Sequence, residues 1–261
     1  MPAIGFICPD GQKICFDDCF SRCRLQDDLP AGRCKALPFL RRVSWQREWK
    51  GQPSVTELLQ GTREMWLKIT RDYYIDPDSR TYALLGTGIH SILEKLTQGD
   101  HLSEERLIGE ICSGQFDFYD GEQQVLYDYK TWGSYKLKSI NDPVQRELSL
   151  LQTSIQLSYY RDLLREHLPS GYDVKKLAVQ VINRDGGTWI SISRGIQERA
   201  PLILLNGISS HWIKKYLTRK KELLLQALER DYAPKCRRTD SWHGRKCNGF
   251  CDVKEICEKI P

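Results

Sequence analysis

The sequence predicts an α/β protein in which a mixed central sheet is flanked by helices. Three observations lead to this prediction. Apolar residues recur at helical spacing in several long segments, short segments rich in Val, Leu and Tyr meet at Asp-Gly turns, and the two kinds of segment follow one another along the chain. With 261 residues, 40% of them hydrophobic and 28% charged, the chain is long enough for one large domain with a smaller appendage.

The N-terminal part is predicted to begin without regular structure and then to form two helices. Residues 1–36 look irregular. Residues 53–74 are predicted to form the first helix, because Ser54 and Glu57 make a capping box just before its apolar positions. The second helix is predicted at residues 86–96. Its apolar stripe comprises Ile89, Ile92, Leu93 and Leu96.

Two hairpins and two further helices are predicted to follow. Asp120-Gly121 is a strong turn signal, and a second turn is expected at Asp185-Gly186-Gly187. The predicted elements are strands at 113–119 and 124–132, a helix at 143–167, a hairpin at 176–194 and a helix at 207–230. The stripe of the long helix comprises Leu148, Leu151, Ile155, Tyr159 and Leu163.

Charged residues in the first hairpin need a reason, because strands are depleted in Asp and Lys. Asp128 and Lys130 are two residues apart, so they point to the same face. A four-residue loop at 120–123 would pair Asp117 with Leu126, which makes Asp117 and Asp128 diagonal neighbours about 7–8 Å apart. Two carboxylates at that spacing can converge on one cation, so a metal site predicts this longer loop.

The combination favours a hydrolytic metal centre over the alternative, an exposed ladder of ion pairs. Two carboxylates hold Mg²⁺ or Mn²⁺ and leave positions for water and a substrate phosphate. Lys130 could orient or deprotonate that water. His90 could supply a further ligand from the facing helix, although a single histidine in such a helix is more often structural.

The ten cysteines, nine of them near the two ends, point to metal binding. The N-terminus lacks the charged head and apolar run of a secretory signal, so we expect a cytoplasmic, reducing compartment, where clustered thiols bind metals. Four thiolates could hold an iron–sulfur cluster or tetrahedral zinc. Cys8 and Cys112 are expected to be ordinary thiols. The C-terminal set is Cys236, Cys247, Cys251 and Cys257, and the N-terminal set, for which zinc is expected, is Cys15, Cys19, Cys23 and Cys34.

These motifs resemble the PD-(D/E)XK nuclease superfamily, in its RecB-like and CRISPR-associated branch of cysteine-cluster exonucleases. Phe116-Asp117 stands at the Pro-Asp position, and Asp128-Tyr129-Lys130 matches Asp-x-Lys. The segment GTGIHSILEKL is similar to the helix that carries the branch's metal-binding histidine, and QLSYY matches its Gln-x3-Tyr pattern. The resemblance spans about residues 50–260.

The cysteine tail resembles the same branch, with two departures. The spacing Cys251-x5-Cys257 is that of its iron–sulfur motif. However, Cys247-x3-Cys251 stands where the family has Cys-x2-Cys, and the predicted first helix contains no cysteine. The upstream partner would therefore be Cys236 or one of the five N-terminal cysteines.

The resemblance implies a restriction-endonuclease-like core with cysteine-rich metal-binding segments at both ends. Residues 1–50 would be the N-terminal segment, residues 51–231 the nuclease core and residues 232–261 a metal-binding tail packed on the core. The implied ligands of Mg²⁺ or Mn²⁺ are His90, Asp117, Asp128 and the carbonyl of Tyr129. Lys130 would be the catalytic lysine, Gln156 and Tyr160 would shape the site or contact DNA, and Glu110 would be either a supporting acid or a surface acid.

The expected function is that of a metal-dependent deoxyribonuclease, an exonuclease acting on DNA ends or single strands. The formal net charge of +5 and the pI of about 8.6 are compatible with a polyanionic partner. Cations that could contact phosphates surround the tail, and three aromatic residues of the chain could stack on unpaired bases. They are Lys214, Lys215, Arg219, Lys220, Lys221, Lys235, Arg237, Arg238, Arg245 and Lys246, with Trp132, Tyr135 and Trp242.

The chain carries no P-loop motif, so a helicase, recombinase or CRISPR component would be a separate partner in DNA repair, recombination or phage DNA processing. A closed oligomeric ring would suit processive digestion, and no run of about 18 apolar residues predicts a membrane span. The alternative is a catalytically silent DNA-binding or assembly protein of the same fold. A radical enzyme is disfavoured, because Cys15-x3-Cys19-x3-Cys23 departs from the C-x3-C-x2-C motif.

Overall fold

The structure is a computed structural model that describes residues 3–96, 101–168 and 173–260. The chain forms two compact units. The first combines residues 1–53, 57–84 and 220–261, so it contains both cysteine-rich segments, and the second combines residues 54–56 and 85–219. Helices α5 (Thr81–Glu94) and α9 (Ser210–Arg230) each begin in one unit and end in the other.

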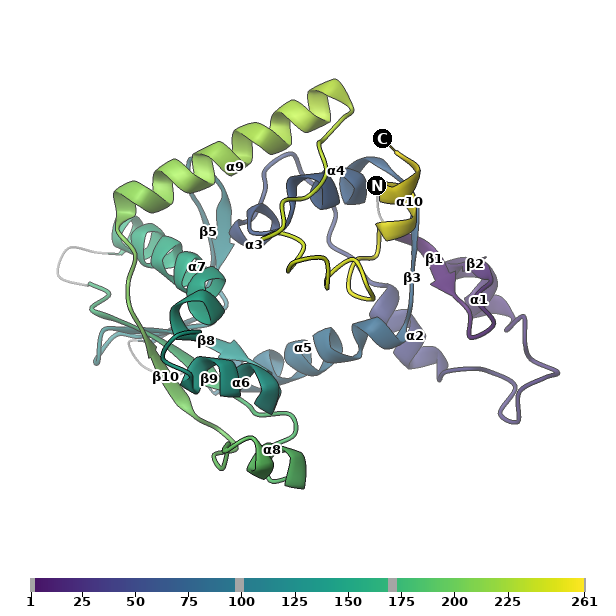
Figure 1. The fold of residues 1–261 in the computed structure, drawn as a ribbon, viewed down its shortest axis with the longest axis horizontal. Coiled ribbons are helices and arrows are strands. Elements are labelled where there is room, and N and C mark those ends of the chain that lie inside the picture. Colours follow the sequence, from purple (N-terminus) through teal and green to yellow (C-terminus); the bar gives the residue numbers. More distant parts are fainter. Residues whose placement is uncertain (1–2, 97–100, 169–172, 261) are drawn as a thin grey trace. The chain divides into compact units, whose positions relative to one another are not determined.

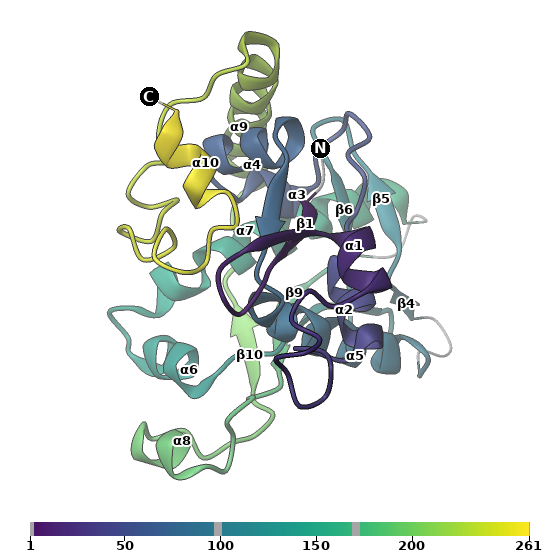
Figure 2. The same ribbon diagram turned by 90° about the vertical axis from the view of Figure 1, so that its right-hand side faces the viewer.

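The first unit is built on a three-stranded sheet in the order β2-β1-β3, with β1 antiparallel to β2 and parallel to β3. Helix α1 packs against β1 and α2, as Figure 2 shows. The prediction that residues 1–36 are irregular is therefore wrong. The elements of this unit, besides parts of α3, α5 and α9, are β1 (Ala3–Ile7), β2 (Lys13–Cys15), α1 (Phe16–Ser21), α2 (Leu37–Ser44), α4 (Thr62–Thr70), β3 (Tyr73–Ile75), the 3₁₀ helix η1 (Asp78–Arg80) and α10 (Lys254–Lys259).

A glycine allows the two N-terminal strands to approach closely. Gly5 pairs with Cys15, and a Cβ atom at Gly5 would lie 2.0 Å from the carbonyl oxygen of Ile14. Ala3 and Phe6 of the same strand are buried. The lack of a side chain at Gly5 thus permits the close pairing of β1 with β2.

The helix predicted at residues 53–74 is interrupted. The structure has a four-residue helix α3 (Val55–Leu58), then α4, and then the strand β3. Gly61 is the N-cap of α4 and is extended, with ψ 133°, and Arg71 ends the helix in an extended conformation. The aromatic and β-branched residues that follow pair with β1 rather than continuing the helix.

The second unit contains a five-stranded mixed sheet in the order β10-β9-β8-β7-β4, which confirms the predicted mixed sheet of an α/β protein. Strands β8 and β9 are parallel, and the other neighbouring pairs are antiparallel. Strands β5 and β6 form a separate antiparallel pair. The elements are β4 (Leu102–Ser103), β5 (Arg106–Ile108), β6 (Ser113–Gln115), β7 (Phe118–Asp120), β8 (Val125–Lys130), α6 (Ser134–Asn141), α7 (Arg146–His167), β9 (Lys176–Val181), α8 (Trp189–Ser193) and β10 (Leu202–Leu205).

The long helix α7 covers the sheet, packing against β8 and β6 (Figure 1). Ile155, Tyr159 and Leu163 are buried, as the apolar pattern predicts. Leu148 and Leu151 are instead 75% and 41% exposed, so the buried stripe does not include the first turn of the helix. Likewise, Ile92 and Leu96 of the predicted second-helix stripe are exposed.

The second predicted hairpin, at residues 176–194, is wrong in its second half. The segment after the glycines forms helix α8, because Thr188 caps it by accepting a hydrogen bond from the backbone N–H of Ser191. Strand β9 finds its antiparallel partner further along the chain, in β10. Among the described residues, no helix is long and apolar enough to span a membrane.

Candidate active site

The first hairpin sets the geometry of the site. Strands β7 and β8 pair Tyr119 with Leu126 and Asp120 with Val125, which leaves a four-residue loop at 121–124. The predicted loop length is correct, but the loop lies one residue later than predicted, so Asp117 does not face Leu126. Extending the observed register places Asp117 level with Asp128. The two carboxylates therefore fall on the same face of the hairpin, as a loop with an even number of residues predicts.

Asp117 is not part of a strand, because the predicted strand at 113–119 is divided. Strand β6 pairs with β5 and strand β7 pairs with β4, and Phe116-Asp117 lies at the change of partner. The Oδ2 atom of Asp117 accepts a hydrogen bond from the backbone N–H of Tyr129 at 2.6 Å. The carboxylate is thereby attached to β8, one residue from Lys130.

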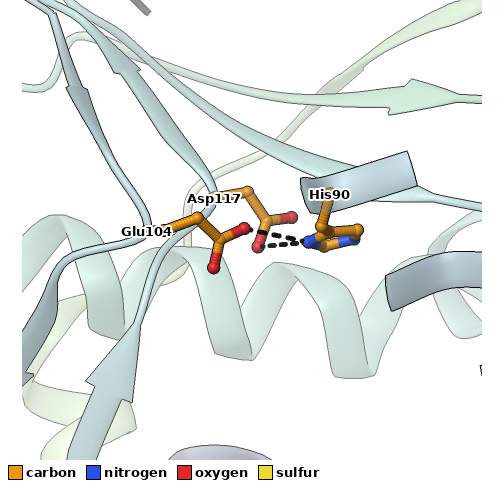
Figure 3. Close-up of side chains that lie close together, drawn as sticks. All are labelled: His90, Glu104 and Asp117. Atoms are coloured by element: carbon orange, nitrogen blue, oxygen red, sulfur yellow. Dashed lines mark hydrogen bonds and ion pairs between the residues drawn. The ribbon is translucent and has the colours of Figure 1, made fainter. Parts of the chain in front are cut away.

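Three ligand-type side chains converge beside this hairpin. The imidazole of His90, on α5, lies with Nδ1 3.1 Å from Glu104 Oε1 and 3.4 Å from Asp117 Oδ1, as Figure 3 shows. One ligand atom from each residue lies within 4.8 Å of the other two. Within the described part of the chain, this is the only such group of His, Cys, Asp or Glu side chains.

Glu104 is the member of this group that the sequence did not reveal. It follows β4 with a positive φ of 51°, and its backbone N–H donates to the carbonyl of Asp117 at 3.1 Å. The side chain of Gln115 donates to Glu104 Oε2 at 2.8 Å. The sequence around it, Ser-Glu-Glu-Arg, looks like exposed loop, and only the chain reversal after β4 turns this carboxylate toward His90.

Asp128 and Lys130 form an ion pair beside the group. Their Oδ2 and Nζ atoms are 2.6 Å apart, and Asp128 is 1% exposed. Asp128 Oδ1 accepts a 3.4 Å hydrogen bond from the Gln156 amide, which also donates to the hydroxyl of Tyr160 at 3.1 Å. The predicted Gln-x3-Tyr pair of α7 therefore contacts the site through Asp128.

The backbone of Tyr129 links the two halves of the site. The Nε2 atom of His90 lies 3.1 Å from the Tyr129 carbonyl, to which it donates when protonated there, and the Tyr129 N–H donates to Asp117. All six predicted residues around Lys130 are thus brought together. Glu110 is not among them: it is exposed and borders a separate small cavity with Tyr159 and Asp162.

The electrostatics match a site built to hold positive charge. Hydrogen bonds to Asp117 and then Glu104 raise the pKa of His90 to about 10. Burial raises the pKa of Asp128 to about 6, against the opposing effect of Lys130. Burial acts to lower the pKa of Lys130, but Asp128 and Asp117 outweigh it and raise that pKa. Without a cation, protonated His90 and Lys130 compensate the acids.

The C-terminal cysteines lie around the first turn of α4. A Cβ atom at Gly61 would lie 2.6 Å from Cys236 Sγ, so the thiol rests on the N-cap of the helix. Arg63 donates from Nε to Cys257 Sγ at 3.1 Å and from its other nitrogens to the carbonyls of Ala233, Cys257 and Ile260. Burial first, and then nearby Glu64, raise the pKa of Cys251 to about 11. Cys247 is half-buried.

Two of the lysines predicted to contact phosphate are instead buried in this unit. Lys220 donates to the carbonyl of Gln60 at 2.7 Å, and Lys246 pairs with Glu64 at 2.5 Å. Their side chains are 11% and 9% exposed. After β8, Tyr135 is 58% exposed and stacks with the Arg194 guanidinium at 5.9 Å from the ring centre.

Comparison with known proteins adds little beyond this geometry. No protein-family profile matches the chain, and no curated protein matches it in sequence. Among solved structures, it is similar to a phage-related exonuclease from Haemophilus somnus 129PT, with a TM-score of 0.44 and 12% sequence identity. The match covers 66% of this chain and 82% of that one.

Proposed function

We propose that the protein is a metal-dependent deoxyribonuclease that hydrolyses phosphodiester bonds at DNA ends or in single strands. The observation that carries this proposal is the convergence of His90, Glu104 and Asp117 next to the Asp128–Lys130 pair. A purely structural ion-pair ladder would not need a histidine, three acids and a lysine, drawn from four separate segments of the chain, at one end of one hairpin.

The donor set fits a hard divalent cation. Carboxylate and carbonyl oxygens and water are the preferred ligands of both Mg²⁺ and Mn²⁺. Glu104 and Asp117 each aim one oxygen at His90. Bound there, Mg²⁺ or Mn²⁺ would activate water and neutralise charge on the phosphate. His90, Glu104 and Asp117 would hold the ion, and we propose Asp128 and the carbonyl of Tyr129 as its further ligands.

The remaining residues orient these groups. Gln156 and Tyr160 fix the carboxylate of Asp128, which in turn holds the ammonium of Lys130. The Lys130 side chain is 27% exposed, so its Nζ can donate to a phosphate oxygen or a water that enters the site. Gln115 restrains Glu104 in the same way.

Single-stranded DNA, or the end of a duplex, suits the surface that follows β8. Exposed Tyr135 offers a ring for an unpaired base, and Arg194 beside it offers a positive charge. We place the protein in DNA repair, recombination or phage- or CRISPR-type DNA processing, beside a separate helicase or recombinase. The C-terminal cysteines would hold an iron–sulfur cluster or zinc, since buried Arg63 and Lys246 and half-buried Lys68 bring positive charge that suits thiolates.

The decisive experiment is cleavage of end-labelled single- and double-stranded DNA by the purified protein with Mg²⁺ or Mn²⁺. We expect metal-dependent products that disappear with EDTA. We expect Lys130→Ala to lower the rate by at least a factor of about 100, the scale of a lost group that assists proton transfer or stabilises charge. The product ladder distinguishes exonuclease from endonuclease action.

The exposed neighbouring lysine variant Lys138→Ala is the matched control, and it should retain full activity. Circular dichroism of Lys130→Ala should match the wild type. If wild type and Lys130→Ala bind DNA equally well and neither cleaves it, the protein is a DNA-binding or assembly protein of this fold, and the nuclease proposal is wrong.

A further inference from the structure

The N-terminal cysteines contain a site that differs from the one their spacing suggests. Cysteines 15, 19 and 23 are evenly spaced, which would favour them as a set. In the structure, however, Cys15 ends strand β2, pairs with Gly5 and is exposed. Helix α1 begins only at Phe16 and ends at Ser21, so Cys19 lies on the helix, Cys15 precedes it and Cys23 follows it.

Cys8, rather than Cys15, lies near the other N-terminal cysteines. Cys8, Cys19 and Cys34 line one cavity, although they come from three different segments of the first unit. Cys19 and Cys23 are 6% and 8% exposed. Burial first, and then the nearby Cys34, Cys8 and Cys23 thiols, raise the pKa of Cys19 to about 11. Cys15 has no part in that effect.

Contacts between the segments hold these four cysteines in the same region. Phe16 and Phe20 on α1 pack on Phe6 of β1, with ring centres 4.7 and 6.2 Å apart, which places Cys19 next to the end of β1 where Cys8 follows. An ion pair joins Arg24 to Asp10 and so connects the residues after Cys23 to the turn after Cys8.

A second contact positions Cys34. Its neighbour Arg33 donates to the carbonyls of Cys19 and Phe20 at 2.8 and 3.0 Å, which fastens the segment to the end of α1. The four cysteines thus come from a hairpin turn, a helix and a loop. The contacts described above join each of these segments to the next. Cys19 and Cys23 are buried and Cys8 and Cys34 are half-buried, and four cysteines are a typical ligand set of structural zinc.

We infer that Cys8, Cys19, Cys23 and Cys34 bind one zinc ion, with Cys15 outside the site. Four thiolates in a reducing compartment form a closed, tetrahedral structural zinc site. Neighbouring sulfurs in such a site are about 3.8 Å apart. In the described chain no three of these sulfurs lie within 4.8 Å of one another, so zinc binding would draw them together. This inference does not depend on the proposed nuclease activity.

The test is the zinc and iron content of the full-length protein, measured by inductively coupled plasma mass spectrometry. Cys8→Ser and Cys34→Ser should each lose about one zinc per chain relative to wild type. The matched control Cys15→Ser should lose none. Cys251→Ser tests the C-terminal cysteines separately. Any metal that this variant loses should be a second metal, distinct from the zinc that Cys8→Ser loses. Retention of zinc in Cys8→Ser, or its loss in Cys15→Ser, would overturn the inference.

Alkylation of the wild-type protein keeps the inference testable if a variant does not fold. Iodoacetamide labelling of the native protein, read by peptide mass spectrometry, should modify Cys15 with or without a chelator. Cys8, Cys19, Cys23 and Cys34 should become reactive only after zinc is removed. If Cys8 reacts as fast as Cys15 before chelation, or if a reductant rather than a chelator exposes the thiols, no zinc site exists there.

Discussion

Glu104 decides how the proposed metal site is completed. Its carboxylate contacts the same nitrogen of His90 that Asp117 approaches, and Gln115 holds its second oxygen. A loop acid with a positive φ and two specific restraints is held in a defined position rather than left to solvent. We therefore expect Glu104 to act directly on the cation.

Glu104→Gln should weaken Mn²⁺ binding by about 10–100-fold, because it replaces a charged ligand with a neutral one. Isothermal titration calorimetry in the absence of DNA measures this affinity without relying on catalysis. The matched variant is Glu105→Gln, which alters the adjacent, exposed acid and should leave the affinity unchanged. Equal affinities for wild type and Glu104→Gln would remove Glu104 from the site.

The residues of the site differ in how readily the sequence reveals them. Asp117, Asp128 and Lys130 stand in a strand-like hairpin where charge is out of place, and Gln156 lies one helical turn from Tyr160. Such local patterns survive folding, and the structure brings all five together. Glu104 has no local pattern, because its role depends on β4 pairing with β7 and reversing the chain. The N-terminal cysteines are misleading for a related reason. Their even spacing suggests one set, but helix α1 begins only at Phe16, after Cys15.

Helix α4 carries a buried carboxylate, Glu64, that forms ion pairs with two lysines. Glu64, with a side chain 3% exposed, pairs with Lys68 at 2.9 Å and with Lys246 of the C-terminal tail at 2.5 Å. Burial acts to raise the pKa of Glu64, but Lys68 and then Lys246 outweigh it and lower that pKa below its ordinary 4.5. The folded state therefore favours the ionised form of Glu64, and this carboxylate connects the tail to the helix.

Glu64→Gln should destabilise the first unit by about 3–5 kcal/mol, because it removes the carboxylate that buried Lys246 shares with half-buried Lys68. A lowered folded-state pKa gives stability that is present above pH 4.5 and is lost as the pH falls through the folded pKa, so the difference from wild type should shrink in acid. Urea unfolding across this range measures it.

Glu258→Gln serves as the comparison for that experiment. It removes an exposed ion pair with Lys254, 3.8 Å long, and should change the free energy of unfolding by no more than about 0.5 kcal/mol. Equal effects of the two variants, or an effect of Glu64→Gln that does not depend on pH, would show that the buried network contributes no special stability.

The elements of the fold were predictable where one pattern extends over many residues. The helices α7 and α9 and the strands β8 and β9 lie close to their predicted ranges. Errors occur where short segments join distant partners. Residues 73–75 continue a helical pattern but pair with β1, and the residues predicted as the second strand after Gly187 form α8 because β9 pairs with β10 instead. Neither partner can be identified from neighbouring residues.

At the scale of the whole molecule, the chain divides its chemistry between two units. The proposed hydrolytic site lies within residues 85–219, and all the cysteines except Cys112 belong to the other unit. Ligands of the two kinds should therefore stabilise different parts of the protein, because a ligand stabilises the folded unit that binds it.

Mn²⁺ at about 100 times its Kd should stabilise the second unit by about 2.7 kcal/mol and raise its melting temperature by about 5–10 °C. Differential scanning calorimetry with and without Mn²⁺ measures this shift. Glu104→Gln should reduce the shift at the same Mn²⁺ concentration. A shift of equal size in wild type and Glu104→Gln would place the stabilising ion elsewhere.

The parallel pairing of β8 with β9 has a consequence for synthesis of the protein. Asp128 pairs with Val179 and Lys130 with Val181, so β8 receives one of its two neighbours only after α6 and α7 have been made. Contacts this distant in sequence form late in folding. A chain emerging from the ribosome therefore carries Asp117, Asp128 and Lys130 long before they are held in place. The order of the strands would therefore delay the proposed hydrolysis of DNA until most of the polypeptide exists.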